Sequence, residues 1–244
     1  MFILHLSKIR VKMLTLGLLF IGLIMVDAGS IGVTRSDLPA PLERIKTADK
    51  VIALTVNVDW GEEIIPGILE VLDQYQAKAT FFVTGRWAKN HPELIKEMDS
   101  RGHQIGNHGY YHSHPDQLPI AKTKEEISAT ERVVEEIIGK KTLFYAPPYG
   151  ERGPNGIKAA SELGYTTVLW TLDTIDWRAD STPEIIAQRI LNPKIRHGIK
   201  PVKSGAIVLM HPKENTMKAL PMILTSLQED GFQMVTVEKL ITYN

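Results

Sequence analysis

The sequence contains no cysteine, and this absence excludes several kinds of site at once. Disulfide bonds, a catalytic thiol and thiolate metal ligands are all ruled out. Nor is there an excess of charge of either sign, since 28 basic residues balance 28 acidic ones. The charge therefore gives no reason to expect nucleic acid or an acidic surface as a partner. The 244 residues are enough for one large domain with a sizeable core.

The N-terminus carries the pattern of an export signal. Lys8, Arg10 and Lys12 come before an apolar run over residues 13–26. A basic segment, an apolar segment of this length and a small residue such as Ala28 are typical of a signal peptide. The run is short for a transmembrane helix, which needs about 20 apolar residues, but an uncleaved anchor stays open as the alternative. We therefore expect residues 1–28 to be a signal peptide or membrane anchor. The protein would then be secreted or held on the outer face of the cytoplasmic membrane, with no other membrane contact.

Strands and helices alternate in the rest of the chain. Residues 29–49 are predicted to be a linker, because glycine, serine and proline break any regular period there. Residues 50–244 are predicted to form one domain, with strands over 51–58, 79–84, 143–145, 166–170, 206–210 and 232–235 and a short strand before His108. Helices are predicted over 63–75, 91–98, 123–139, 156–163, 182–191 and 217–228, the third capped by Thr123 with Glu126 three residues later. This alternation indicates a parallel sheet with helices outside it, either an open doubly wound sheet or a barrel.

Polar side chains follow the ends of several predicted strands. Asn57 and Asp59 end the first strand, His108 and His112 follow the short third one, and His211 follows the strand over 206–210. Because active sites of parallel α/β folds lie at the carboxyl ends of the strands, we expect these side chains to share one site. Two imidazoles and the Asp59 carboxylate would complete a metal site with open positions for water and substrate. Such a metal would lower the pKa of bound water and polarise an amide carbonyl.

Asp59 and His211 also have ordinary structural interpretations, and the metal site has an alternative ligand. Asp59 is suited to the turn before Trp60 and Gly61. His211 is either a general acid that protonates a leaving amine near neutral pH or a hydrogen-bonded core histidine. His114 is an alternative metal ligand, because it follows the histidine pair by two residues.

Six segments, in this order, resemble the motifs of the polysaccharide deacetylases of the NodB-homology type: 53–61, 79–83, 102–108, 146–150, 170–177 and 207–212. The resemblance covers about residues 50–241. The Trp60-Gly61 pair after the first strand looks most like the sporulation-associated branch of that family. The resemblance implies an α/β fold, a distorted and incomplete (β/α) barrel with about seven parallel strands. It also implies metal-dependent hydrolysis of the amide bond in N-acetylated amino sugars of cell-wall glycan.

The resemblance further implies roles for residues around the reaction. His211 is the expected general acid, and Asp173 is the expected acidic residue that tunes it, whereas Asp176 is also suited to capping a loop. Tyr149 brings a backbone N–H that resembles the family's oxyanion donor.

The resemblance also implies a substrate groove and a metal. Pro147, Pro148, Tyr149 and Trp177 are expected to line the sugar-binding groove, although the two aromatic residues are equally suited to the core. The metal ligands are expected to be the two histidines of the pair, His108 and His112, together with Asp59. Zinc is the first choice of divalent metal, with cobalt or nickel as alternatives.

The sequence departs from the family's pattern at two positions. The family's first motif begins with an aspartate that acts as general base, and the matching residue here is Asn57. An amide cannot take a proton from water near neutral pH, whereas a carboxylate can. The family's third motif has an arginine that pairs with this base, and the matching residue here is Ala146. We interpret the two changes as coupled, which leaves Asp59 as either a metal ligand or a relocated base.

These observations predict an exported, deacetylase-like hydrolase with impaired activity. The alternative is a catalytically silent protein of the cell envelope that binds glycan or metal on the same fold. A third interpretation is a structural envelope protein without metal. Cell-wall glycan is the expected partner in the first two cases, nucleic acid is not expected, and the oligomeric state is left open.

Overall fold

A computed structural model describes residues 38–194 and 202–244. The predicted signal peptide or anchor over residues 1–28, and the first part of the predicted linker, lie outside the described residues. In the part of the chain that is described, no helix combines the length and the apolar character needed to cross a membrane.

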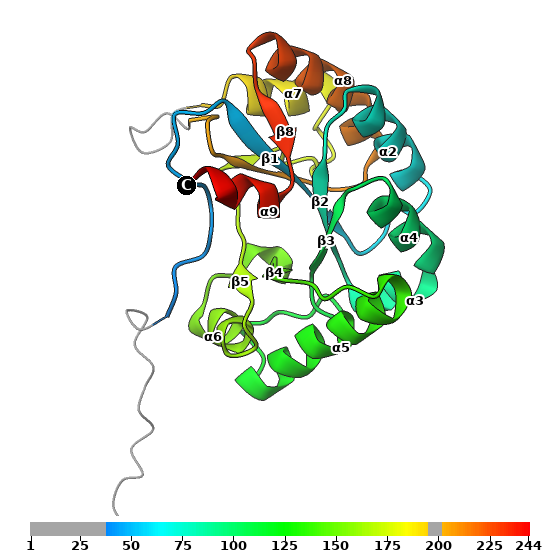
Figure 1. The fold of residues 1–244 in the computed structure, drawn as a ribbon, viewed down its shortest axis with the longest axis vertical. Coiled ribbons are helices and arrows are strands. Elements are labelled where there is room, and N and C mark those ends of the chain that lie inside the picture. The colour runs from blue at the N-terminus through cyan, green and yellow to red at the C-terminus, as the bar shows by residue number, and fades with distance from the viewer. Residues whose placement is uncertain (1–37, 195–201) are drawn as a thin grey trace, which may run out of the picture. The chain divides into compact units, whose positions relative to one another are not determined.

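The centre of the fold is one curled sheet in which every strand pairing is parallel (Figure 1). Seven strands follow the order β5-β4-β3-β2-β1-β7-β6, and β8 pairs with the beginning of β1. Their bounds are β1 Val51–Val58, β2 Ala79–Val83, β3 Gln104–Asn107, β4 Phe144–Tyr145, β5 Thr166–Thr167, β6 Leu172–Asp173, β7 Ile207–Met210 and β8 Gln233–Val235. The predicted α/β fold, an incomplete barrel with about seven parallel strands, is confirmed.

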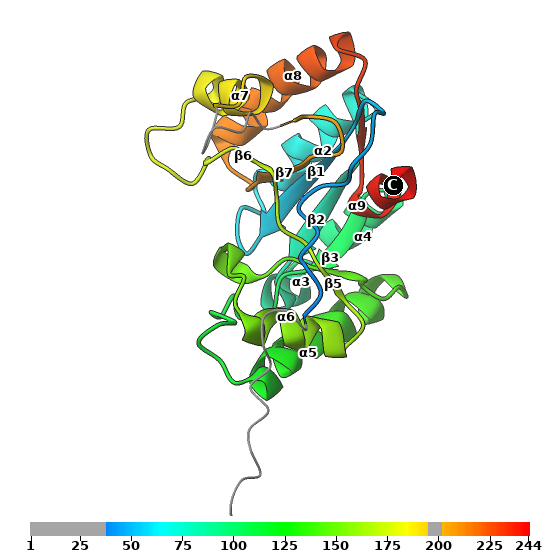
Figure 2. The same cartoon turned by 90° about the vertical axis from the view of Figure 1, so that its left-hand side faces the viewer.

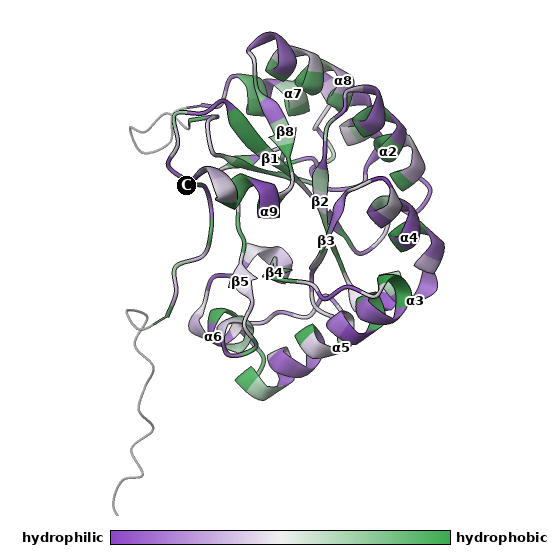
Figure 3. Ribbon diagram, in the orientation of Figure 1, coloured by the Kyte–Doolittle hydropathy of each residue, from purple (hydrophilic) through white to green (hydrophobic). Residues whose placement is uncertain are grey.

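Helices cover the outer side of the curled sheet (Figures 1 and 2). They are α2 Ile65–Gln74, α3 Gly85–Asn90, α4 Pro92–Ser100, α5 Ile120–Ile138, α6 Pro154–Glu162, α7 Pro183–Leu191 and α8 Glu214–Glu229. The short α9 Val237–Leu240 packs on the other face of β1, in the same hydrophobic cluster as Val51 and Ala53. Hydrophobic and hydrophilic residues alternate around α5 and α8 (Figure 3). This pattern is expected for helices that pack one face on a sheet and leave the other in water.

Strand β1 separates two layers of core. Ile52, Leu54 and Val56 pack toward α2 and α8 in the larger hydrophobic cluster, whereas Val51 and Ala53 belong to a second cluster with residues of β4 and β7. Successive side chains of a strand point to opposite faces, so a strand buried on both faces reads as a continuous apolar run. This is why the sequence predicts β1 with its observed bounds.

A segment before β1 packs on the sheet, although the sequence assigns it to the linker. Leu42 bridges Val168 after β5, and Arg44 bridges Ala206 before β7. Ile45 is buried in the same region. Residues 42–45 therefore join two parts of the sheet that do not pair with each other directly, across the open side of the incomplete barrel.

One predicted helix start is wrong. Thr123 does not cap α5, which begins three residues earlier at Ile120, after Pro119. Thr123 is buried inside the helix, and its hydroxyl has no hydrogen-bond partner among the described residues. Proline cannot continue a helix on its N-terminal side without losing a backbone hydrogen bond, so the helix starts directly after it. The short elements α3, β6 and α9 are not predicted, since two to six residues carry too little periodicity.

Candidate active site

The predicted site residues gather at the carboxyl edge of the sheet. Asp59 follows β1, Thr84 follows β2, His108 follows β3, Ala146 follows β4 and His211 follows β7. The parallel pairing of these strands brings their ends to one edge. The prediction that residues distant in sequence share this edge is therefore supported by the topology.

The loop from His108 to His112 brings two imidazoles together. Their ring centroids are 4.9 Å apart. The ring of His108 is buried, and its Nδ1 lies 2.6 Å from the carbonyl oxygen of Ala146. In the neutral ring this contact places the proton on Nδ1 and leaves the lone pair on Nε2. Burial, aided by the neighbouring His112, lowers the pKa of His108 to about 3, so the ring is neutral at physiological pH.

His112 is held in an unusual backbone conformation. Its φ is 58°, in the left-handed region that non-glycine residues seldom occupy. Burial lowers the pKa of His112, the nearby Asp59 opposes this shift, and His211 and Arg86 add to it. The His112 ring also lies against Tyr149, with centroids 4.6 Å apart. Such strain persists only where the surroundings fix the residue.

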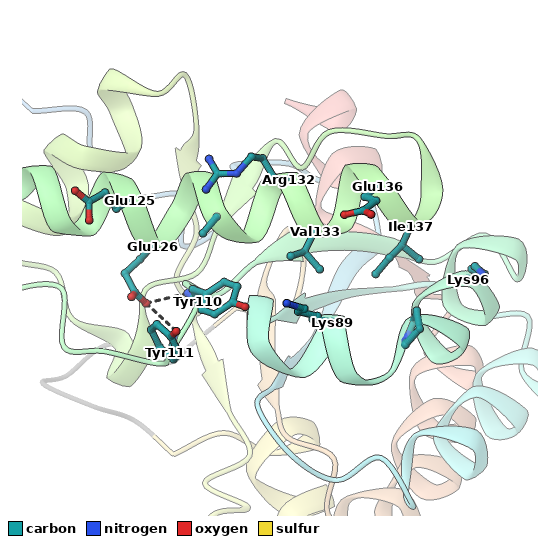
Figure 4. A pocket seen from close by; sticks show the side chains of 12 residues that line it. Lys89, Lys96, Tyr110, Tyr111, Glu125, Glu126, Arg132, Val133, Glu136 and Ile137 are labelled. Carbon is teal, nitrogen blue, oxygen red and sulfur yellow. Dashed lines mark hydrogen bonds between the residues drawn. The ribbon is translucent and has the colours of Figure 1, made fainter.

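Helix α5 fixes the histidine loop through Glu126 (Figure 4). The backbone N–H groups of Tyr110 and Tyr111 both donate to Oε2 of Glu126, at 2.9 and 2.8 Å. Asn107 adds a second anchor, because its Oδ1 accepts from the N–H of Gly109 while its Nδ2 donates to a carbonyl of α5. Beside this contact lies a cavity of about 920 Å³ between α3 and α5. Most of its lining comes from α5, with further residues from α3, α4 and the loop at Tyr110 and Tyr111, and it does not include the histidine pair.

Asp59 is engaged by a cation. Nε of Arg86 donates to Oδ1 of Asp59 at 3.1 Å, and Nη2 donates to Oδ2 at 2.6 Å. The hydroxyl of Thr84 also donates to Oδ1, at 2.7 Å. The hydrogen bonds and charge of Asp59 raise the pKa of Arg86, so the guanidinium stays charged. Both carboxylate oxygens therefore have strong partners from the start of α3.

The position matched to the family's base is buried and lacks a partner. Asn57 is buried, and its Oδ1 accepts no hydrogen bond from any described residue. Ala146, matched to the family's arginine, is buried in the second hydrophobic cluster, the one that contains Val51 and Ala53. A buried acceptor without a donor costs about 1–3 kcal/mol. The structure therefore contains neither a base at Asn57 nor a cation at Ala146.

His211 is paired with Asp176, and not with Asp173 as the family resemblance implies. Nδ1 of His211 lies 2.7 Å from Oδ1 of Asp176, and the His211 backbone N–H donates to Oδ2 at 2.7 Å. Burial by itself would raise the pKa of Asp176, but hydrogen bonds from His211 and Thr216 outweigh it, and the pKa is lowered. The charged Asp176 therefore orients the ring. The carboxylate of Asp173 instead accepts from Trp170 and from the backbone N–H of Ile175.

Aromatic side chains lie around the carboxyl edge of the sheet, at the mouth of the candidate site. Tyr149 and Trp177 are both exposed to 58%, which excludes the core interpretation for them. Tyr149 also has a left-handed φ of 61° and stacks on His114 with centroids 3.7 Å apart. This stacking, and the contact of His114 with Glu151, leave His114 without a place in the histidine pair.

The remaining predicted groove residues differ from these aromatics. Pro147 and Pro148 are buried, so they shape the loop and do not present a surface to substrate. Trp60 lies at the mouth as well, parallel to the ring of His211 at 6.4 Å and beneath Lys213. The exposed rings of the described residues that could contact a sugar therefore include Trp60, Tyr149 and Trp177.

The residues present fit the implied metal only in part. The two histidines fit, because His108 is neutral and keeps Nε2 free, and a ring nitrogen held by a carbonyl is a common arrangement in metal sites. The carboxylate fits poorly, because both oxygens of Asp59 accept from the cationic Arg86, which competes with a metal for them. Within the described residues, no three histidine, aspartate or glutamate side chains are grouped so that they could hold a metal ion.

Sequence reasoning missed three partners of the predicted residues. Arg86 stands three residues past the end of β2, so its place near the site edge is readable from the sequence. The sequence pattern predicts Glu126 as part of a helix cap, and Asp176 as a residue suited to capping a loop. For these two, only the three-dimensional path of the loops reveals the contact.

The chain was also compared with known proteins. The family model described as "Polysaccharide deacetylase" matches residues 44–168. A peptidoglycan-N-acetylglucosamine deacetylase from Bacillus cereus is 34% identical over 201 residues, which are 80% of this chain and 90% of that protein. The Bacillus subtilis protein YlxY is also 34% identical, over 83% of this chain. The matched region spans 61% of the length of YlxY.

A solved structure extends this likeness to the fold. A protein from Bacillus anthracis, described as a CE4 family pseudoenzyme, superposes with a TM-score of 0.75 and 36% identity. The match covers 84% of this chain and 70% of that protein. A mutant of that pseudoenzyme is described as having restored enzymatic activity, and it matches with the same TM-score of 0.75.

Proposed function

Since this chain belongs to the polysaccharide deacetylase family, whose named relatives are peptidoglycan N-deacetylases, we propose that it hydrolyses N-acetylated amino sugars of cell-wall glycan slowly. In this reaction water adds to the acetyl carbon, the amide C–N bond breaks, and acetate and a free amino sugar are released. The exposed rings of Trp60, Tyr149 and Trp177 suit contact with sugar faces.

The missing base at Asn57, beside an assembled acid, supports a slow reaction. The pair that would protonate the leaving amine is assembled, because His211 is held by Asp176 through two contacts of 2.7 Å. The position of the base is occupied by Asn57, which has no acidic group and an unpartnered Oδ1. Loss of a general base typically reduces the rate about 10²- to 10⁴-fold, without removing the binding surface.

Acetate release from N-acetylglucosamine oligomers tests this proposal. The full chain should release acetate slowly with added zinc or cobalt, and His211→Ala should reduce the rate at least about 100-fold, since the leaving amine then lacks its acid. His103→Gln is a matched control, because His103 is buried at the opposite end of β3 from the site. A rate that survives His211→Ala would contradict the proposed acid.

A second candidate is a silent protein that binds glycan. The likeness to a structure described as a pseudoenzyme favours it, together with the missing base at Asn57. In that case the oligomers should bind, and binding should weaken in Trp177→Ala, while no variant releases acetate. Calorimetric titration measures the oligomer binding expected of both candidates, and acetate release separates them, because only the slow hydrolase shows a turnover that depends on His211.

We also propose export through residues 1–28. The support is the sequence pattern of Lys8, Arg10 and Lys12 before the apolar run. A reporter active only outside the cytoplasm should gain activity when it is fused to residues 1–30. Replacement of Leu18 and Leu19 by arginine in the fusion should abolish this activity, and an active reporter in that variant would speak against the proposal.

A further inference from the structure

The ion pair between Arg86 and Asp59 has the geometry of a strong, two-point contact. The guanidinium reaches both oxygens of the carboxylate, at 3.1 and 2.6 Å, and Thr84 adds a third donor at 2.7 Å. Such paired N–H···O bonds between arginine and a carboxylate are directional and about twice as strong as neutral hydrogen bonds. The Asp59 side chain is only 12% exposed, so water screens the contact weakly.

The backbone holds Arg86 in this place. The N–H of Thr84 donates to the carbonyl of Val58, which ties the end of β2 to the end of β1. The N–H groups of Gly85 and Arg86 donate to the carbonyls of Gly109 and Tyr110 in the histidine loop. Gly85 is required for this approach, because a Cβ there would lie 2.4 Å from the ring of Tyr110. Arg86 is therefore anchored to both parts of the expected metal site.

A guanidinium and a divalent ion compete for the oxygens of one carboxylate. Arginine is permanently charged, and its planar fork matches the carboxylate along both oxygens. Oδ1 accepts two hydrogen bonds and Oδ2 accepts one, so one of the four lone pairs of Asp59 stays free, and a divalent ion bound there would lie close to the positive charge of Arg86. The Arg86 side chain is about half exposed, so it has room to leave when it loses its partner.

We infer that Arg86 keeps Asp59 out of metal coordination, so that the chain offers a two-histidine site with weak affinity for zinc. The guanidinium supplies the positive charge beside Asp59 that a metal ion supplies in a three-ligand site. The inference concerns the same site as the proposed function. It is tested by metal binding and not by turnover, so each can fail without the other.

Zinc affinity of the full chain is the measurement, by competition with a chromophoric chelator. Arg86→Gln should bind zinc about 10- to 100-fold more tightly than the wild type, because a third ligand becomes free. The double variant Arg86→Gln, Asp59→Asn should lose this gain, since it lacks the carboxylate. Arg86→Lys should gain less than Arg86→Gln, because lysine keeps the charge but not the fork.

The double variant separates a freed ligand from a simple change of charge. If the tighter binding persisted without Asp59, loss of the Arg86 charge would explain it and the inference would be overturned. An Arg86→Gln variant that folds like the wild type and binds zinc no more tightly would also overturn it.

Arg101→Gln is the matched control, because Arg101 makes a comparable ion pair with Asp73 at the amino-terminal end of β3. Its zinc affinity should equal that of the wild type. Cobalt absorption of each variant reports the ligand set independently of the affinity.

Discussion

At Asn57 an amide stands where the family resemblance places a carboxylate, and its Oδ1 is buried without a partner. At Ala146 a methyl group stands where the resemblance places an arginine. Both residues are buried, so a charge restored at either one alone enters a poorly hydrated site. An isolated buried charge is strongly unfavourable, whereas an opposite charge nearby offsets much of that cost.

Restoring both residues should therefore raise the rate more than the two single changes predict. We expect Asn57→Asp with Ala146→Arg to release acetate faster than the wild type, by up to about 10²- to 10⁴-fold. The single variants should gain little, because one lacks the orienting cation and the other adds an unpaired cation. Acetate release is measured for the wild type and the three variants, and the coupling is read from the non-additivity.

The same measurements also decide the role of Asp59. Circular dichroism shows whether each variant is folded before its rate is interpreted. A wild-type rate that is already high, and that falls in Asp59→Asn, would contradict the impaired enzyme and identify Asp59 as a relocated base.

For single residues, the sequence identifies the members of the site better than it identifies their hydrogen-bond partners. Strand ends predict that Asp59 and His211 meet at one edge, but not that Arg86 binds the first or that Asp176 binds the second. The choice of Asp176 over Asp173 depends on the path of the loop. Ile175 has a left-handed φ of 49°, which turns the chain between the two aspartates, and no periodicity in the sequence encodes such a turn.

Among the elements, α5 supports the site from outside it, because Glu126 accepts hydrogen bonds from two consecutive backbone N–H groups of the histidine loop. The loop includes His112 with its left-handed φ, and such a conformation needs support from its surroundings. The carboxylate of Glu126 supplies that support from outside the site. The residue therefore acts on the geometry of the histidines without touching substrate.

Glu126→Ala should loosen this loop and lower the stability of the fold. We expect a loss of about 1–3 kcal/mol in the free energy of unfolding, because two hydrogen bonds to a charged group are removed. The amide hydrogens of Tyr110 and Tyr111 should exchange at least about tenfold faster, since about 1.4 kcal/mol corresponds to a factor of ten. Urea unfolding and hydrogen exchange measure the two effects.

Neighbouring variants give the control for Glu126. Glu126→Gln keeps an oxygen acceptor and should show a smaller loss. Glu125→Ala should leave both measurements unchanged, because Glu125 is exposed and accepts its hydrogen bond from Lys122 in the same helix. Equal effects in Glu125→Ala and Glu126→Ala would assign the change to the helix and not to the loop contact.

For the whole molecule, the sequence alone leaves an open sheet and a barrel as alternatives, and the family resemblance selects the correct one. An open sheet and a barrel differ in how the edges of the sheet meet. Strand patterns in the sequence do not predict this arrangement. Residues 42–45 bridge both sides of the gap in the barrel, but glycine and proline before them make the segment resemble a linker. Contacts between distant segments, and not local propensity, decide this part of the fold.

The stability of the whole fold should depend on pH through His103. This residue lies at the amino-terminal end of β3, 3% exposed, and its Nδ1 accepts from the backbone N–H of Ala79 at 3.2 Å. Burial lowers the pKa of His103 to about 4, and the charges of Lys78 and Arg101 add to this effect while Asp73 opposes it. A protonated Nδ1 would also face an N–H donor in place of an acceptor.

The direction of this pH dependence follows from the different proton affinities of His103 in the folded and unfolded chain. In the unfolded chain His103 binds a proton near pH 6.5, whereas in the folded protein it stays neutral down to about pH 4. The free energy of unfolding should therefore fall as the pH drops from about 6.5 to about 4, by at most about 3 kcal/mol from this residue. His103→Gln keeps an acceptor for Ala79 but does not titrate, so its stability should fall less over this range. Urea unfolding at several pH values compares the two proteins, and their difference at pH 8 isolates the effect of packing. Parallel curves for the two proteins between pH 4 and 6.5 would show that the acid sensitivity of the fold arises from other groups.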